Sequence, residues 1–345
     1  GFKGGWLSTW LLEMGAEVAG FSLKPDTDPC FFSLCGLGDR VRSVIADIRD
    51  KDALTRAMQQ SQPEIVFHLA AQPIVRRSYQ DPVETFSTNV MGTVNLLDAV
   101  RRTPSVRAVV VVTSDKCYEN KERIGGYRED DPMGGHDPYS ASKGCAELVT
   151  TAYRRSYFAD KSSPVAVASV RAGNVIGGGD WGEDRLVPDA VRAFQQNQPL
   201  VVRNPEAVRP WQHVLEPLAG YLMLAERLYR ENSTWAGAWN FGPRDQDAVP
   251  VATLADMVFR LWGKGSWHAG GDQDQPHEAD RLTLDWSKAR RVLGWRPLLS
   301  LDEAVGLTVS WYQQAVSAEL RPDMYKTTAS QIADYESRLR TLSHG

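Results

Sequence analysis

The sequence predicts an α/β protein with a doubly wound parallel sheet and a smaller C-terminal α/β lobe that is interleaved with it. The chain has 345 residues, more than twice the usual length of one domain, so we expect one large α/β unit or two lobes that share a cleft. Apolar residues make up 42% and charged residues 24%, as in ordinary globular proteins. Up to about residue 170, short β-rich runs alternate with helical patterns. Neighbouring parallel strands need a long connection, usually a helix, so this alternation predicts a parallel sheet.

Each element follows from a local pattern. The first helix carries an apolar stripe from Trp6 to Met14 and ends at Gly15, which suits a helix C-cap. Five runs are predicted as buried strands, at residues 17–21, 41–45, 64–69, 108–113 and 165–171. Helices are predicted at residues 50–60, with Asp50 as N-cap, and at 83–102 and 139–157. Past residues 177–179, three consecutive glycines, the pattern loosens, so we place the boundary between the lobes after residue 173.

Charge and cysteine content exclude several classes. The net charge of −4 gives no electrostatic reason to expect nucleic acid or an anionic membrane as partner. The four cysteines form no CxxC pair, so we expect reduced thiols, a cytoplasmic protein and no structural metal site. No run approaches the ~20 apolar residues of a membrane span, and no basic-then-apolar leader opens the chain.

The chain opens on Gly1-Phe2-Lys3-Gly4-Gly5, a pattern typical of the end of a glycine-rich loop. We therefore expect the first strand of the sheet to precede residue 1. Glycines before a helix let backbone amides approach a pyrophosphate, although a plain turn explains two glycines equally well. Asp47 either hydrogen-bonds an adenine amino group or only shapes the turn, and the small residues at the end of the 64–69 strand either make room for a ligand or simply pack.

A sharper group of residues follows the 108–113 strand. Ser114-Asp115-Lys116 comes directly after it, and Tyr139 and Lys143 lie one turn apart on a predicted helix. An ammonium beside a phenol favours the phenolate, so we expect Lys143 to lower the pKa of Tyr139 from ~10 toward neutrality and make it a general base. A YxxxK pattern alone also occurs on solvated helices, but Ser114 at the strand end favours the catalytic interpretation.

Together these motifs resemble the extended short-chain dehydrogenase/reductase superfamily, whose order they follow over nearly the whole chain. Within it, residues 1–4, 113–118, 171–181 and 276–279 most resemble the sugar-nucleotide dehydratases that act on CDP-glucose. Dehydratases for other nucleotides carry Asp-Glu where this chain has Asp115-Lys116. The resemblance implies a Rossmann-type dinucleotide domain at 1–173 and a sugar-nucleotide domain over most of 174–345, with some segments returning to the first domain.

The resemblance also implies the residues of the site. Cofactor contacts are expected from Gly1, Phe2, Lys3, Gly4, Ser22, Asp47, Ile48, Leu69, Ala70, Ala71, Gln72, Asn89, Thr113, Tyr139 and Lys143. Substrate contacts are expected from Asn174, Arg185, Leu186, Val187, Arg209, His277 and Glu278, with Arg209 and Asn174 on the diphosphate. His68, His136 and His213 are expected to be packed or surface residues.

The implied chemistry is an oxidation followed by an elimination. Tyr139 would take the proton of the sugar C4 hydroxyl while hydride passes to NAD, with Ser114 on the same oxygen and Lys143 on the nicotinamide ribose. A ketone at C4 acidifies the C5 hydrogen, so water can leave with Asp115 as acid and Lys116 as base or electrostatic helper. Return of the hydride to C6 would regenerate NAD and leave a 4-dehydro-6-deoxy sugar, a precursor for surface polysaccharide such as O-antigen.

Other interpretations remain open. A sugar-nucleotide 4-epimerase would use Tyr139 and Lys143 without any need for Asp115-Lys116, and a non-catalytic NAD-binding regulator would have no need of Ser114, Tyr139 and Lys143. Ser22 stands where NAD-binding units often place an acid, so the choice of NAD over NADP rests on the need to retain the hydride. The helices at 83–102 and 139–157 carry surplus apolar residues, so we expect a homodimer or a dimer of dimers.

Overall fold

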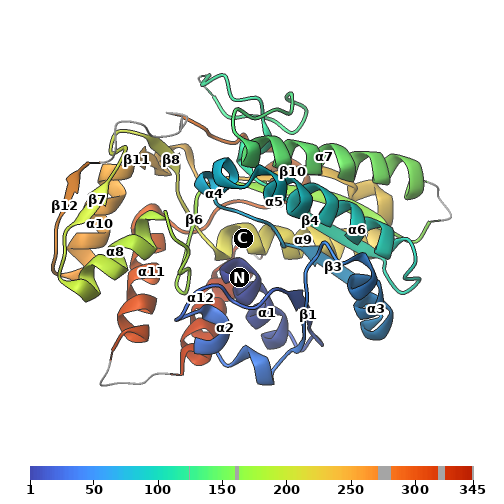
Figure 1. The fold of residues 1–345 in the computed structure, drawn as a ribbon, viewed down its shortest axis with the longest axis horizontal. Helices are drawn as coiled ribbons and strands as arrows, with labels where there is room; N and C mark the ends of the chain where they lie inside the picture. The colour runs from blue at the N-terminus through green and yellow to red at the C-terminus, as the bar shows by residue number, and fades with distance from the viewer. Residues whose placement is uncertain (124, 160–162, 271–280, 318–322, 344–345) are drawn as a thin grey trace.

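A parallel sheet of four strands, in the order β10-β5-β4-β3, forms the centre of the fold (Figure 1). The structure is a computed structural model that describes residues 1–123, 125–159, 163–270, 281–317 and 323–343. The strands are β3 (Ile65–His68), β4 (Ala108–Val112), β5 (Ala166–Ala172) and β10 (Gly237–Phe241). The predicted α/β class with a parallel sheet is confirmed, and β10 from the C-terminal half pairs with β5.

Helices cover both faces of this sheet. Side chains alternate along β4, so that Val109 packs with Leu97 on one face while Val110 joins the cluster of Leu218 on the other. The first face carries α6 (Gly92–Val100) and α7 (Pro138–Tyr157), and the second carries α9 (Leu215–Glu231) (Figure 1). Burial on both faces explains why β4 and β5 are almost continuously apolar.

The first two strands stand apart from the main sheet. β1 (Ala19–Ser22) and β2 (Arg42–Ile45) pair in parallel with each other and share no hydrogen bonds with the four-stranded sheet. Every residue of β2 is exposed, so the prediction of buried strands at 17–21 and 41–45 is wrong in its burial. A two-stranded pair gives helices little surface to cover, and α3 (Lys51–Ser61) packs on β1. Asp50 accepts the Ala53 N–H at 2.9 Å as the predicted N-cap of α3.

The predicted helix at 83–102 is interrupted. It consists of α5 (Pro82–Phe86), a π-helical turn (Ser87–Met91) and α6. Asn89 lies in the wider turn, where its side chain accepts the Gln72 N–H at 2.8 Å and donates to Ser142 Oγ at 2.8 Å. A π turn within a helix is frequent at functional sites. Here it ties the end of β3 to α7.

The first helix, α1 (Phe2–Glu13), follows the prediction, and Gly15 behind it has a φ of +82° that favours glycine. The C-terminal half adds α8 (Leu186–Gln196), α10 (Val251–Trp262), α11 (Leu301–Ala315) and α12 (Met324–Ser343), besides the short α2 (Phe31–Leu34) and α4 (Val75–Gln80) of the first half. Three small sheets pair β6 (Val175–Ile176) with β9 (Gln212–His213), β8 (Val208–Pro210) with β11 (Ala248–Pro250), and β7 (Leu200–Val202) with β12 (Trp267–Ala269).

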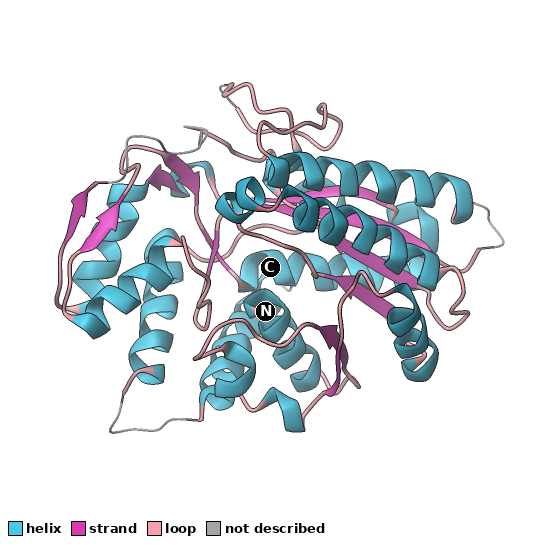
Figure 2. Cartoon of the chain, in the orientation of Figure 1, coloured by secondary structure: helices cyan, strands magenta, loops and turns pink. Residues whose placement is uncertain are grey.

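Figure 2 shows that β7 and β12 lie with their helices to one side of the main sheet. α12 returns to pack against α1. None of the helices in the described part of the chain combines the length and the apolar composition needed to cross a membrane.

Candidate active site

The segment after β4 turns sharply and carries the first half of the site. Ser114 caps a short 3-10 turn, Asp115–Cys117, by accepting the Lys116 N–H at 3.2 Å. Its hydroxyl also donates to Asp115 Oδ1 at 2.9 Å. Ser114 and Asp115 are both buried, whereas Lys116 is half-buried. The cap and the turn therefore fix both side chains at the carboxyl end of the strand.

Helix α7 supplies the second half. Asp137 caps its N-terminus by accepting the Ser140 N–H at 2.9 Å, and Pro138 occupies the first turn. Tyr139 and Lys143 follow in the first two turns, with 8% and 6% of each residue exposed. The Tyr139 hydroxyl is hydrogen-bonded with Ser114, and Lys143 Nζ lies 5.9 Å from the centre of the tyrosine ring. The structure thus brings Ser114, Tyr139 and Lys143 together as predicted.

The expected lowering of the Tyr139 pKa is wrong for the protein by itself. Burial removes water from the phenolate and raises the pKa of Tyr139 to about 12, while the hydrogen bond with Ser114 and the charge of Arg185 act in the opposite direction. Burial likewise lowers the pKa of Lys143 to about 8, against the influence of Cys117 and Glu147. Desolvation is the largest cause of both pKa shifts, because both side chains are buried.

Asp115 lies against Gly173, which is distant in sequence and is also close to Pro210. A Cβ added to Gly173, just after β5, would lie 3.1 Å from Asp115 Oδ2 and 2.8 Å from Pro210 Cγ of β8. Burial raises the pKa of Asp115, opposed by the charge of Lys116, the Ser114 hydrogen bond and the charge of Arg209. A carboxyl group whose protonated form is favoured suits a proton donor.

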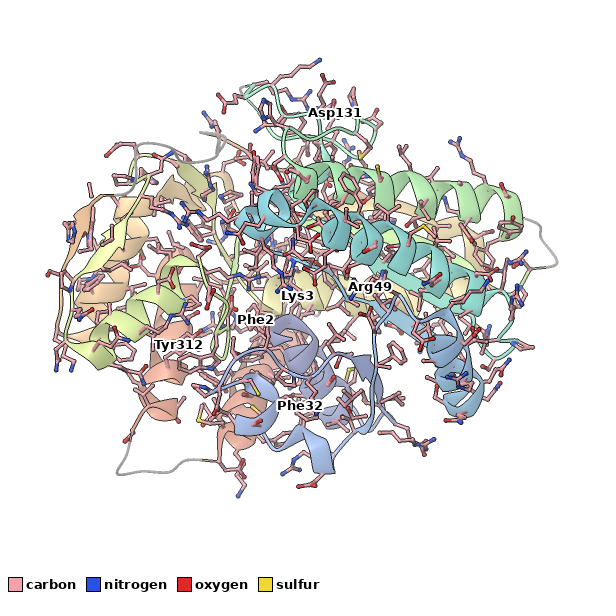
Figure 3. The ribbon with its side chains drawn as sticks, viewed as in Figure 1. Phe2, Lys3, Phe32, Arg49, Asp131 and Tyr312 are labelled. Atoms are coloured by element: carbon pink, nitrogen blue, oxygen red, sulfur yellow. The ribbon has the colours of Figure 1, made fainter. Side chains whose placement is uncertain are left out.

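The start of α1 has the features of a dinucleotide site. A Cβ on Gly1 or Gly4 would meet nothing within 4 Å, so open space lies beside the N-terminal turn of this twelve-residue helix. Phe2 and Lys3 lie at this helix start in the middle of the molecule (Figure 3). Burial lowers the pKa of Lys3 to about 8, helped by the charges of Lys143 and Arg185. The N-terminal turn therefore faces the catalytic group.

Several other predicted cofactor residues follow the carboxyl ends of β1, β2 and β3. Asp47 is engaged by Arg49, whose Nη2 lies 2.5 Å from Oδ2 and whose backbone N–H donates at 2.8 Å. Gln72 directs its amide to Thr85 Oγ1 at 2.8 Å, so it braces the loop after β3. The remaining members are exposed Ser22, buried Ile48 and half-buried Leu69, Ala70 and Ala71.

The predicted substrate residues lie on the C-terminal half. Asn174 is half-buried between β5 and β6, and Arg209 lies in β8 with its charge acting on Asp115. Arg185 precedes α8 and donates from Nη1 to Asp180 Oδ2 at 2.6 Å. Half-buried Leu186 follows it, while Val187 packs in the core, 3% exposed. His277 and Glu278 lie outside the described residues.

Sequence reasoning missed two buried ionic residues, Glu147 of α7 and Arg171 of β5. They form an ion pair next to Thr113, the residue before Ser114. The four-residue spacing from Lys143 to Glu147 was visible in the sequence, as was an arginine within an apolar strand. His68 and His213, expected to be packed or surface residues, are buried. Among the described residues, no three His, Cys, Asp or Glu side chains are grouped to hold a metal ion.

Comparison with known proteins gives a consistent result. Residues 1–308 match the family described as GDP-mannose 4,6 dehydratase. A Salmonella typhimurium protein described as CDP-glucose 4,6-dehydratase is 52% identical over 341 residues, which cover 98% of this chain and 94% of the relative. A UDP-glucose 4-epimerase from Mycolicibacterium smegmatis is 29% identical over 80% of this chain and 84% of the relative.

Solved structures share the fold. DesIV, a dTDP-glucose 4,6-dehydratase from Streptomyces venezuelae solved with NAD and TYD bound, has a TM-score of 0.77 at 26% identity and covers 91% of this chain and 94% of its own. The UDP-glucose 4-epimerase of Thermus thermophilus in complex with NAD has a TM-score of 0.78 at 25% identity, covering 92% and 97%.

Proposed function

The chain belongs to the GDP-mannose 4,6 dehydratase family, and we propose that it converts CDP-D-glucose to CDP-4-dehydro-6-deoxy-D-glucose and water. One observation supports this function: the buried group at the ends of β4 and α7 brings together Tyr139, whose phenolate would accept a proton, and Asp115, whose carboxyl group would donate one. An oxidation at C4 needs the first, and elimination of water needs the second. The choice of CDP-glucose rests on the Salmonella relative at 52% identity. The product would supply deoxysugar for surface polysaccharide.

NAD is the cofactor, as in the solved relatives that hold it. The open space at Gly1 and Gly4 suits a pyrophosphate against the N-terminus of α1, and Lys143 suits the ribose next to the reacting ring. When bound, NAD supplies the hydride acceptor for the oxidation at C4 and the hydride donor at C6.

In the oxidation, Tyr139 Oη receives the proton of the sugar C4 hydroxyl. Ser114 Oγ is hydrogen-bonded with the phenol and holds the same sugar oxygen in line. Burial raises the pKa of Tyr139 to about 12, so the residue can accept this proton only as the phenolate, which the hydrogen bond with Ser114 and the charge of Arg185 favour. The burial of Ser114, Tyr139 and Lys143 keeps water away from the phenol.

In the elimination, Asp115 gives its proton to the C6 hydroxyl oxygen. Burial favours its protonated form beforehand, and the charge of Lys116 stabilises the carboxylate that remains. Lys116 follows on the same 3-10 turn, so it is also placed to remove the C5 proton or to stabilise the charge that develops there. An epimerase needs neither of these residues.

The direct test is turnover of a substrate panel. We expect the protein with NAD to form a 4-dehydro-6-deoxy sugar chiefly from CDP-glucose, because the relative with 52% identity acts on that sugar nucleotide by name. UDP-, dTDP- and GDP-hexoses serve as matched alternatives, with products resolved by mass spectrometry. Epimerised sugar that retains the C6 oxygen would instead establish the epimerase.

The protein is also proposed to form at least a dimer through α5 and α7, which contact each other and lie side by side (Figure 1). These helices expose large apolar side chains: Val83 is 76%, Leu148 60% and Tyr157 50% exposed. Pairing with a second copy would remove these side chains from water. Light scattering should give at least twice the monomer mass of 38.3 kDa, and the variant Leu148→Asp should lower it; a wild-type monomer at micromolar concentration contradicts the proposal.

The cysteines support an enzyme that works in the cytoplasm. Cys30, Cys35, Cys117 and Cys145 are all free, and the first three are buried. Burial raises the pKa of Cys35 to about 12, so this thiol stays protonated and unreactive. A cytoplasmic fraction without the protein would contradict this assignment.

A further inference from the structure

A buried ion pair, Glu147 with Arg171, lies next to the segment that carries Ser114 and Asp115, and none of the steps above uses it. Arg171 of β5 donates from Nε to Glu147 Oε1 at 2.9 Å and from Nη2 to Oε2 at 2.8 Å. Each side chain is only 3% exposed. Thr113 Oγ1 donates to Oε1 at 2.5 Å and Ser169 Oγ to Oε2 at 2.7 Å, so each carboxylate oxygen accepts two hydrogen bonds.

The partners of this pair stand at both ends of the catalytic segment. Thr113 immediately precedes Ser114, and its hydroxyl is held by Glu147. Tyr118 immediately follows the 3-10 turn, and its hydroxyl accepts from Arg171 Nη1 at 2.5 Å and donates to Asn240 Oδ1 at 2.8 Å. Residues 114–117 are therefore tied at each end to one ion pair.

The same pair belongs to the helix of the catalytic base. Glu147 follows Lys143 by four residues, one helical turn along α7. Burial by itself would raise the pKa of Glu147. The hydrogen bonds and the charge of Arg171, together with the hydrogen bonds from Thr113 and Ser169, hold this pKa below its usual value. The carboxylate thus keeps its charge, and with it the bonds that join α7 to β4 and β5.

A buried ion pair contributes little to stability on average, because the desolvation of two charges offsets their attraction. Stability is therefore a poor explanation for this arrangement, whereas placement of two catalytic elements is a specific one. Catalysis is sensitive to placement, since an error of ~1 Å can cost about 100-fold in rate.

We propose that Glu147 and Arg171 are positioning residues, which hold Ser114, Asp115 and Lys116 in register with Tyr139 and Lys143 through Thr113 and Tyr118. The kinetic test of this inference, kcat for CDP-glucose, rests on the proposed dehydratase function. The second test, amide hydrogen exchange, needs no substrate and is independent of that function.

The test uses two hydroxyls that bond to the same carboxylate. Thr113→Val removes the hydrogen bond from Thr113 to Glu147, and Ser169→Ala removes the one from Ser169 in β5. Each variant takes one hydrogen bond from the Glu147 carboxylate, but only Thr113→Val releases the segment 114–117 from it. We expect Thr113→Val to lower kcat for CDP-glucose about 10-fold or more with KM within about 3-fold, Thr113→Ser to restore it, and Ser169→Ala to leave kcat within about 2-fold. Tyr118→Phe releases the other end without touching a predicted cofactor residue and should also lower kcat.

Amide hydrogen exchange gives a readout that needs no substrate. The Lys116, Cys117 and Tyr118 amides are hydrogen-bonded within the turn, to Ser114 Oγ and to the Ser114 and Asp115 carbonyl oxygens. They should exchange faster in Thr113→Val and Tyr118→Phe than in Ser169→Ala, at a similar melting temperature. Equal exchange in the three variants, or kcat losses that only follow the loss of thermal stability, would overturn the inference. A wild-type protein that does not dehydrate CDP-glucose would refute the proposed function, and the exchange result would still decide this inference.

Discussion

Replacing Tyr139 with Phe is expected to lower the rate of CDP-glucose turnover by about 10²–10⁴-fold, the range for loss of a positioned general base. The ring is kept, so the packing of this buried residue survives, while the hydroxyl that is hydrogen-bonded with Ser114 is lost. Neither a 4-ketone nor the absorbance of reduced nicotinamide should appear in single-turnover experiments.

Tyr153→Phe is the matched control, because it makes the same change on the same helix, away from the catalytic residues. It should keep near wild-type turnover. If Tyr139→Phe retained more than a tenth of wild-type activity while folded, another group would be the base, and the assignment to Tyr139 would be wrong.

Replacing Asp115 with Asn should separate oxidation from elimination. The amide has nearly the same size and leaves Tyr139 in place, but it cannot give a proton to the C6 hydroxyl. We expect the 4-ketone to form and dehydration to slow by about 10²–10⁴-fold. The measurements are a transient absorbance of reduced nicotinamide and retention of the C6 oxygen in the trapped sugar, followed by mass spectrometry.

Asp52→Asn, on the exposed first turn of α3, controls for the loss of one negative charge and should behave as wild type. Two outcomes are informative for Asp115. Slow elimination after normal oxidation supports its role as acid. A variant that binds CDP-glucose normally but fails to oxidise it would show that Asp115 serves the first step instead.

Much of the fold could be predicted because it depends on residues close in sequence. Gly15 ends the first helix and Asp50 begins α3, since each satisfies backbone groups within its own turn. The apolar runs of β4 and β5 predicted a sheet covered on both faces, and it is. The burial of β1 and β2 could not be predicted, because it depends on which layers pack against them and not on their own residues.

The site divides in the same way. The spacing of Tyr139 and Lys143 on one helix predicted their proximity, and Ser114 at a strand end predicted its meeting with them. The direction of the Tyr139 pKa shift was wrong, because desolvation depends on all the atoms that surround the ring. The Glu147–Arg171 pair escaped notice, since its partners come from β4, β5 and the turn at Tyr118.

The sequence by itself predicted the order of the proposed catalytic side chains, the helix that carries Tyr139 and Lys143, and the parallel class of the sheet. These properties follow from backbone hydrogen bonding and from periodicity, which act over a few residues. Tertiary structure alone decided that Asp115 and Pro210 both lie against Gly173, that Tyr139 is a buried phenol with a raised pKa, and that one ion pair joins the strand-end segment to α7. Burial and electrostatic interaction sum over groups brought together by folding, so their balance at a site is set only when distant segments meet.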